Sequence, residues 1–167
     1  MTDKVLQELL DKQAINEVLL NYAHGIDHQD EDRLRSVFHP ESEHNHGFVG
    51  PSSTPDKPST NGDPNDFVGF ALSYMKGFVN SHHQLGTPLV ELHGNLARSE
   101  CYFTATQRMR AKGDPLAPAM AQDTEMQISM GGRYLDELEK RDGVWKIINR
   151  TGVLDWQRSL PAADRPA

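Results

Sequence analysis

The sequence predicts an α+β fold in which helices come first and long antiparallel strands follow, bending into a cone. Three observations carry this prediction. Residues 3–26 have helical spacing of apolar side chains, the second half of the chain has two hairpin signals, and no regular alternation of helix and strand is seen. Because long strands that bend around a helix leave an open mouth, the fold also predicts a pocket.

The N-terminal helix is predicted from apolar residues that recur at intervals of three and four. Gly25 is expected to weaken its end. Asp30 or a neighbour is expected to cap a second, short helix over Glu31–Phe38, which Pro40 stops. The apolar positions of the first helix are Leu6, Leu9, Leu10, Val18, Leu19, Tyr22, Ala23 and Ile26.

The next segment predicts a short strand and a loop. Over Glu43–Val49, alternation would place His44, His46 and Phe48 on one face of a strand. Residues 50–64 hold four prolines and no periodicity, which indicates either a mobile loop acting as a lid or a variable surface insertion.

The second half of the chain predicts one more helix and four long antiparallel strands. Two hairpins are expected, at His93-Gly94-Asn95 and at Asp142-Gly143. Residues 1–157 should therefore form one domain, and residues 158–167 a loose tail. The predicted elements are a helix over Asp66–Asn80, strands over Ser81–Leu92, Ala97–Arg110, Gln127–Lys140 and Trp145–Trp156, and a loop over Lys112–Gln122.

Composition limits the location and the partners. The formal net charge of −7 argues against nonspecific binding to nucleic acid or anionic lipid. No apolar run is long enough for a membrane span, and the N-terminus lacks the pattern of a secretory signal. The single cysteine, Cys101, allows no intrachain disulfide and fits a reducing compartment. The sequence thus predicts a cytoplasmic protein that acts on a small molecule.

Asp27 stands out because it follows a helix and is flanked by His24 and His28. A carboxylate there could cap the next helix or take part in proton transfer. Helical phase does not let both histidines converge with Asp27, so His24 and His28 are predicted to lie on the surface.

The order and spacing of several segments resemble SnoaL-like proteins of the nuclear transport factor 2-like superfamily, whose fold is the cystatin-like cone. The resemblance covers nearly the whole chain except residues 50–64 and the tail. The segments that carry it are Gln13-Ala14-Ile15 through Tyr22, Asp27, Asp32-Arg33-Leu34, Phe38-His39-Pro40, His83-Gln84-Leu85-Gly86, and Tyr134 through Ile147 with Glu137 and Arg141-Asp142-Gly143-x-Trp145.

The chain looks most similar to the branch with scytalone dehydratase, bile-acid 7α-dehydratase and hexachlorocyclohexane dehydrochlorinase. This resemblance implies a lyase that needs no metal or cofactor and uses Asp27 and His83 as its pair. The family spacing to Gly86 and Glu91 selects His83 over His82, and Tyr22 would help position the substrate or leaving group. The resemblance also implies a homo-oligomer, with a trimer favoured over a dimer.

Other outcomes stay open at this point. The same pair could catalyse an isomerisation or a polyketide-cyclase-type ring closure, or the domain could be a noncatalytic small-molecule-binding or scaffold protein. The small subunit of a ring-hydroxylating dioxygenase shares the fold and ranks lower, because this chain retains its own Asp–His pair.

Five further residues are predicted to bind substrate. His44 and His46 would lie across the pocket from the pair, as hydrogen-bonding groups or as mere lining; with His83 they could instead form a zinc site, which the metal-free relatives disfavour. Arg150 could bind a carboxylate or a departing oxygen of the substrate, or form an ion pair with a Glu on the neighbouring strand. Tyr74 and Phe78 are expected to form pocket wall or core.

Overall fold

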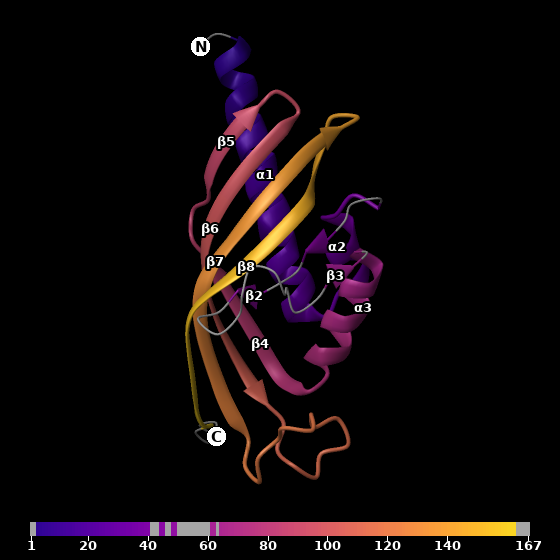
Figure 1. Ribbon diagram of the computed structural model, residues 1–167, viewed down its shortest axis with the longest axis vertical. Coiled ribbons are helices and arrows are strands. Elements are labelled where there is room, and N and C mark those ends of the chain that lie inside the picture. Colours follow the sequence, from indigo (N-terminus) through magenta and orange to yellow (C-terminus); the bar gives the residue numbers. More distant parts are fainter. Residues whose placement is uncertain (1–2, 41–43, 46–47, 50–60, 63, 163–167) are drawn as a thin grey trace.

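The computed structural model describes residues 3–40, 44–45, 48–49, 61–62 and 64–162. Figure 1 shows these residues as a long sheet beside a long helix. The helices are α1 (Asp3–His28), α2 (Glu31–Ser36) and α3 (Pro64–Met75). The strands are β1 (His44–Asn45), β2 (Phe48–Val49), β3 (Asn61–Gly62), β4 (Phe78–Leu85), β5 (Leu89–His93), β6 (Leu96–Met109), β7 (Met126–Arg141) and β8 (Val144–Pro161).

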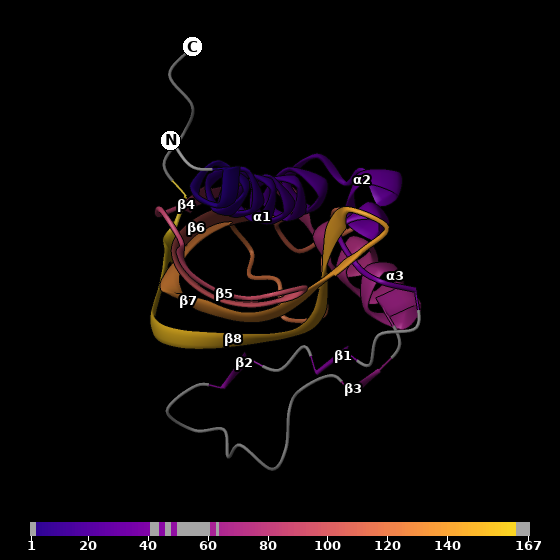
Figure 2. The same cartoon turned by 90° about the horizontal axis from the view of Figure 1, so that it is seen from above.

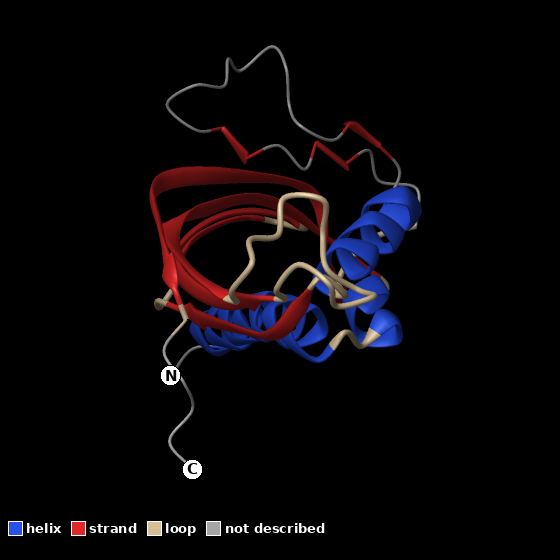
Figure 3. Cartoon of the chain, turned by 90° about the horizontal axis from the view of Figure 1, so that it is seen from below, coloured by secondary structure: helices blue, strands red, loops and turns tan. Residues whose placement is uncertain are grey.

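The main sheet has the strand order β2-β8-β7-β6-β4, and β5 also pairs with β6. Its long strands are antiparallel, while β2 runs parallel to β8. Figure 2 shows the sheet curving around α1, which lies across its open side. Figure 3 shows α2 and α3 beside one end of α1. The predicted α+β cone is confirmed.

The core lies between α1 and the inner face of the sheet. One face of α1 is buried, including Ile15, Leu19, Tyr22 and Ile26. Along β6 every second side chain is buried, as expected for a strand with one covered face. No helix of the described residues is long and apolar enough to span a membrane.

The ends of the first two helices depend on Gly25 and Asp30. The helix predicted to end at Ile26 continues to His28, so Gly25, expected to weaken its end, lies within α1. A Cβ on Gly25 would lie 3.0 Å from Leu34, so glycine is needed for the close approach of α2. Asp30 caps α2, as predicted, by accepting a hydrogen bond from the Arg33 backbone amide at 3.0 Å.

The boundary between α3 and the sheet differs from the prediction. The predicted helix over Asp66–Asn80 ends at Met75, and Phe78 already belongs to β4. The strand expected over Ser81–Leu92 is two strands, β4 and β5. Pro88, which lacks a backbone N–H for the ladder, lies between them. In β4 the pairing with β6 shifts register between Phe78 and Asn80, which marks a β-bulge.

Both predicted hairpins are present. Gly94, Asp142 and Gly143 all have positive φ, as tight hairpin turns require. The tail prediction fails in part: β8 continues to Pro161 because residues 158–161 pair with the start of β7, and residues 163–167 lie outside the described part.

The single strand predicted over Glu43–Val49 is replaced by two short ones. β1 pairs with β3 in a separate two-stranded sheet, whereas β2 pairs with β8. The common face predicted for the side chains of His44, His46 and Phe48 lies outside the described part of the chain. Most of the predicted loop, residues 50–60 and 63, lies outside the described residues.

Candidate active site

Asp27 and His83 form a hydrogen-bonded pair, although 56 residues separate them in the sequence. The Asp27 Oδ1 lies 2.6 Å from the His83 Nδ1. The Asp27 Oδ2 accepts a hydrogen bond from the His83 backbone amide at 2.7 Å. The Ser81 hydroxyl donates to Asp27 Oδ1, also at 2.7 Å. Both oxygens of the carboxylate are therefore held by β4.

The alternation of β4 explains why these two residues meet Asp27. Ser81 and His83 lie on the inner face of the sheet, whereas His82 is exposed on the other face. Asp27 does not cap α2, because Asp30 does so. The end of α1 is thus free to present a carboxylate to the strand.

The pKa of Asp27 is lowered by its surroundings. Burial alone would raise this pKa, but the hydrogen bonds and charge of His83 and the hydrogen bond of Ser81 outweigh burial. Asp27 is therefore ionised at neutral pH. An ionised carboxylate on Nδ1 holds the proton there and leaves Nε2 as the basic nitrogen of a neutral His83.

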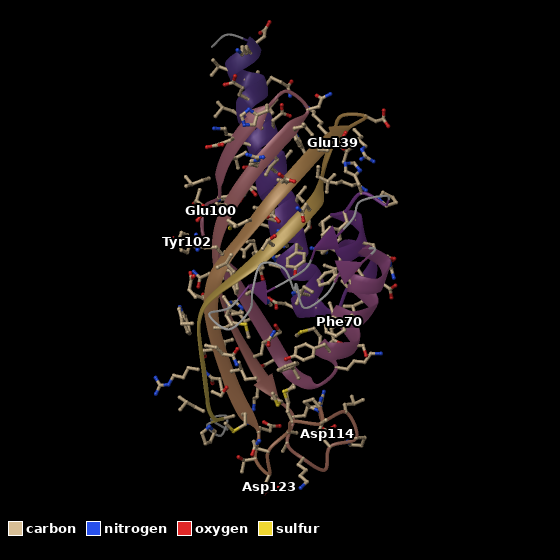
Figure 4. All side chains as sticks on the ribbon, viewed as in Figure 1. Phe70, Glu100, Tyr102, Asp114, Asp123 and Glu139 are labelled. Carbon is tan, nitrogen blue, oxygen red and sulfur yellow. The ribbon has the colours of Figure 1, made fainter. Side chains whose placement is uncertain are left out.

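His83 opens onto a cavity of about 340 Å³ between α1, α3 and the sheet. Two glutamine side chains supply amide groups to its wall, and six of the lining residues are aromatic. Phe70, which lines it from α3, is labelled in Figure 4. The lining residues are Tyr22, Ile26, Phe67, Phe70, Ala71, Tyr74, Met75, His83, Phe103, Gln107, Met130, Tyr134, Leu154 and Gln157.

A second aspartate, Asp136, forms an ion pair with Arg150 behind the cavity wall. Arg150 is 0% exposed and donates two hydrogen bonds to Asp136, from Nε at 2.6 Å and from Nη2 at 2.9 Å. Its guanidinium carbon lies 4.0 Å from the centre of the Tyr22 ring and 4.4 Å from that of Tyr134. Two tyrosine rings therefore cover this charge.

The buried groups around Arg150 have shifted pKa values. Burial raises the pKa of Tyr22, and the positive charge of Arg150 offsets only part of that rise. Burial also raises the pKa of Tyr134 well above its ordinary value. Burial would lower the pKa of Arg150, but Asp136 more than compensates and raises it. Both tyrosines are thus protonated and Arg150 is charged at neutral pH.

The structure brings together some predicted site residues and not others. Tyr22, Tyr74 and His83 line the cavity, and Asp27 contacts His83. Phe78 is buried beside Tyr74, with 5.1 Å between ring centres, and is not among the lining residues. Arg150 likewise does not line the cavity, because it is bound to Asp136 on the neighbouring strand.

The two histidines of the predicted short strand cannot be placed in the site. The backbone of His44 belongs to β1, where it pairs with Gly62. The side chain of His44 and all of His46 lie outside the described part of the chain. Among the described residues, no group of three His, Cys, Asp or Glu side chains is arranged to hold a metal ion.

His24 and His28 lie on the exposed side of α1, as predicted. Their rings stack with 5.7 Å between centres.

Ser81 and Gln107 are site residues that the sequence analysis missed. Ser81 is two residues before His83, so in a strand both side chains point to the same face. This alternation could have identified Ser81 from the sequence. Gln107 is one of two polar residues, with Ser99, in the buried row of β6, which is a second signal in the sequence.

The curved sheet with a long helix across its open side defines the nuclear transport factor 2-like cone fold. A model of the SnoaL-like domain matches residues 7–151. The chain therefore belongs to the SnoaL-like family. No curated protein matches it in sequence.

Several solved structures have a similar fold at low sequence identity. One is the hexachlorocyclohexane dehydrochlorinase LinA-type3 from Novosphingobium barchaimii, which is 18% identical with a TM-score of 0.69 and covers 97% of this chain and 98% of that chain.

A protein of Novosphingobium aromaticivorans, provisionally assigned as a scytalone dehydratase, is 18% identical with a TM-score of 0.69 and covers 100% of this chain and 95% of that chain. The Kfla4162 protein of Kribbella flavida is 18% identical with a TM-score of 0.72, covering 90% of this chain and 95% of that one. At this level of identity the similarity shows the fold alone.

Proposed function

We propose that this chain is a cofactor-independent lyase that eliminates water or a comparable group from a small hydrophobic or cyclic substrate. The observation that carries the proposal is the Asp27–His83 pair, with 2.6 Å between Oδ1 and Nδ1, at the wall of an aromatic cavity. The similar folds of a dehydrochlorinase and a provisionally assigned dehydratase support it.

His83 acts as the base in this mechanism. Its Nε2 takes a proton from a substrate carbon, the electrons of that C–H bond form a C=C bond, and the leaving group departs with its own bonding pair. Asp27 orients the imidazole and stabilises the imidazolium that forms, without accepting the proton itself. The ionised state of Asp27 suits this role.

Tyr22 acts as the acid. It lines the cavity, and its raised pKa keeps it protonated at neutral pH. It would donate its proton to a departing hydroxyl, which leaves as water. Arg150, 4.0 Å from the Tyr22 ring, stabilises the phenolate that results, and the proton on His83 then returns to Tyr22 through solvent.

The test uses candidate hydroxylated or halogenated ring compounds in D₂O, followed by mass spectrometry. Loss of a group is expected from the native protein, while His83→Ala and Asp27→Asn should each reduce turnover at least a hundredfold. His82→Ala is the matched control, because His82 is the neighbouring histidine on the outer face, and it should keep full turnover.

Other outcomes would identify the alternatives. Deuterium incorporation without loss of a group would indicate an isomerase, and ring closure a cyclase. Full turnover by folded His83→Ala would contradict the role of the pair, and saturable binding without any reaction would indicate a binding domain. Substrate contacts by His44, His46, Tyr74, Phe78 and Arg150 stay predictions that substitution of each would test by its effect on KM.

We further propose that the chain forms a homo-oligomer through the outer face of the sheet. Leu89, Tyr102, Leu135 and Trp156 expose large apolar side chains there. Figure 4 shows Tyr102 and Glu100 on the side of the sheet away from α3. Light scattering should give a multiple of 18.7 kDa, with a trimer expected from the family resemblance, and a monomer would contradict the proposal.

A further inference from the structure

Gln107 is a buried amide in an apolar row of side chains. It is only 5% exposed, and its contacts are weak: Nε2 lies 3.7 Å from the Met75 sulfur and 3.5 Å from the Ser81 Oγ. A buried amide with such partners has unused hydrogen-bonding capacity facing the cavity that it lines. The inner row of β6 around it is Cys101, Phe103, Ala105, Gln107 and Met109.

Ser81 fixes which way the Gln107 amide is turned. The Ser81 hydroxyl has one hydrogen, which it donates to Asp27 Oδ1 at 2.7 Å. Its oxygen can therefore only accept from Gln107, so the NH₂ group faces Ser81 and the carbonyl oxygen lies on the other edge of the amide. Within the part of the chain that the structure describes, no group donates a hydrogen bond to this carbonyl oxygen.

The rest of the cavity limits what the carbonyl oxygen could bind. No Lys, Arg, Asp or Glu is found among the described residues that line it, so a charged ligand would lose its hydration without gaining an ion pair. The aromatic rings of the wall favour a flat, apolar ligand body. A single hydrogen-bonding substituent would then fix the orientation of that ligand.

Gln107 is also placed correctly relative to His83. In the β4–β6 ladder Ser81 pairs directly with Gln107, and His83 follows two residues later on the same face. The backbones of such diagonal neighbours lie roughly 7–8 Å apart. One ring can therefore contact both side chains.

We infer that Gln107 is a specificity-determining residue, whose carbonyl oxygen accepts a hydrogen bond from a hydroxyl group on an uncharged ring-shaped substrate. The inference rests on the proposed function for the role of His83. The hydroxyl bound by Gln107 is not the leaving group, since departure needs a proton donor, which a carbonyl oxygen is not. Gln107 orients the ring and presents another of its carbons to His83.

The experiment measures binding by calorimetry with two probes of similar shape, 2-naphthol and 2-fluoronaphthalene. Only the first has a hydroxyl donor. The native protein should bind 2-naphthol roughly three- to tenfold more tightly, the effect of one hydrogen bond. Gln107→Met and Gln107→Leu should each reduce this ratio to within about twofold. Gln157→Met is the matched control, because it removes the other cavity amide, and it should leave the ratio unchanged.

Because binding is measured without turnover, the result is separate from the lyase proposal. His83→Ala should keep the preference for 2-naphthol while losing elimination activity. A preference that survives in either folded Gln107 variant, or that disappears in His83→Ala, would overturn the role of Gln107. Absence of saturable binding of both probes to the native protein would overturn the ligand class.

Discussion

Two hydrogen-bonded pairs, each with one carboxylate, differ in their access to the cavity: Asp27 of α1 with His83 of β4, and Asp136 of β7 with Arg150 of β8. Asp27 holds His83, whose ring is part of the cavity wall. Asp136 holds Arg150 at full burial, with tyrosine rings over the guanidinium. The Asp136–Arg150 pair is sealed from the cavity, whereas the Asp27–His83 pair is open to it through the ring of His83, as the proposed proton transfer requires.

The difference shows that burial of a charged pair does not by itself indicate a catalytic site. The Asp136–Arg150 contact satisfies both carboxylate oxygens, and the neighbouring Ser99 hydroxyl lies 3.4 Å from Asp136. At the open pair, His83 keeps one ring nitrogen for the cavity. Four substitutions test this contrast.

The largest effect on stability is expected from Asp136→Ala. It leaves the Arg150 charge buried without its partner, which should lower the free energy of unfolding by about 3–5 kcal/mol in urea titrations. Glu100→Ala is the control, because its partner Arg133 is partly exposed, and it should cost less than about 1 kcal/mol. Equal losses in the two variants would contradict a special role for the sealed pair.

Asp27→Ala is expected to lower the free energy of unfolding by less than Asp136→Ala does. The variant removes three hydrogen-bond contacts, but the cavity can admit water to the groups left behind, so about 1–2 kcal/mol should be lost. The same urea titrations measure it. A loss as large as that of Asp136→Ala would show that the open pair is also a structural requirement.

Ser81→Ala should lower the free energy of unfolding by about 0.5–1.5 kcal/mol. It removes one hydrogen bond to Asp27 and leaves the contacts between Asp27 and His83 in place. Ser73→Ala on the exposed side of α3 serves as the control and should change stability by less than about 0.5 kcal/mol. Chemical denaturation of the three proteins in parallel would distinguish them, and identical midpoints would argue against the Ser81 contact.

The smallest effect is the pH dependence of the open pair. The pKa of Asp27 in the folded chain lies below its ordinary value of 3.8. The ionised carboxylate therefore contributes fully to the stability of the fold above pH 3.8, and this contribution is lost as the pH falls through the lowered pKa. The difference in unfolding free energy between the native protein and Asp27→Asn should therefore shrink on acidification below about pH 4. A difference independent of pH would contradict the ionised state of Asp27.

Much of the fold follows from local patterns. The apolar spacing of Leu19, Tyr22 and Ile26 predicts the buried face of α1, and Asp142-Gly143 fixes the last hairpin. The apolar residues predicted for the same face at the start of the helix are exposed instead: Leu6, Leu9 and Leu10. The stretch around Phe78 could not be assigned, because an apolar residue there fits both the helical period and the start of a strand. Its strand state comes from pairing with Met109, 31 residues later.

The candidate site depends more on long-range pairing. Family resemblance selected Asp27 and His83, and the structure places them in contact. The partner of Arg150 could not be chosen from the sequence, because the β7–β8 ladder contains two register shifts and several acids lie nearby. Gln107 needed the β4–β6 register before its position opposite Ser81 had any meaning.

The bulge near the start of β4 decides which of two adjacent histidines meets the acid. Phe78 is buried on the inner face, so strict alternation would turn Asn80, His82 and Gln84 inward after it. The extra residue reverses this parity, and Ser81 and His83 face Asp27 instead. One extra residue at the bulge thus sets which side chains of the rest of the strand face inward. Deleting Val79 would remove the bulge while leaving Asn80 opposite Arg108, so Ser81 and His83 would stay on the inner face.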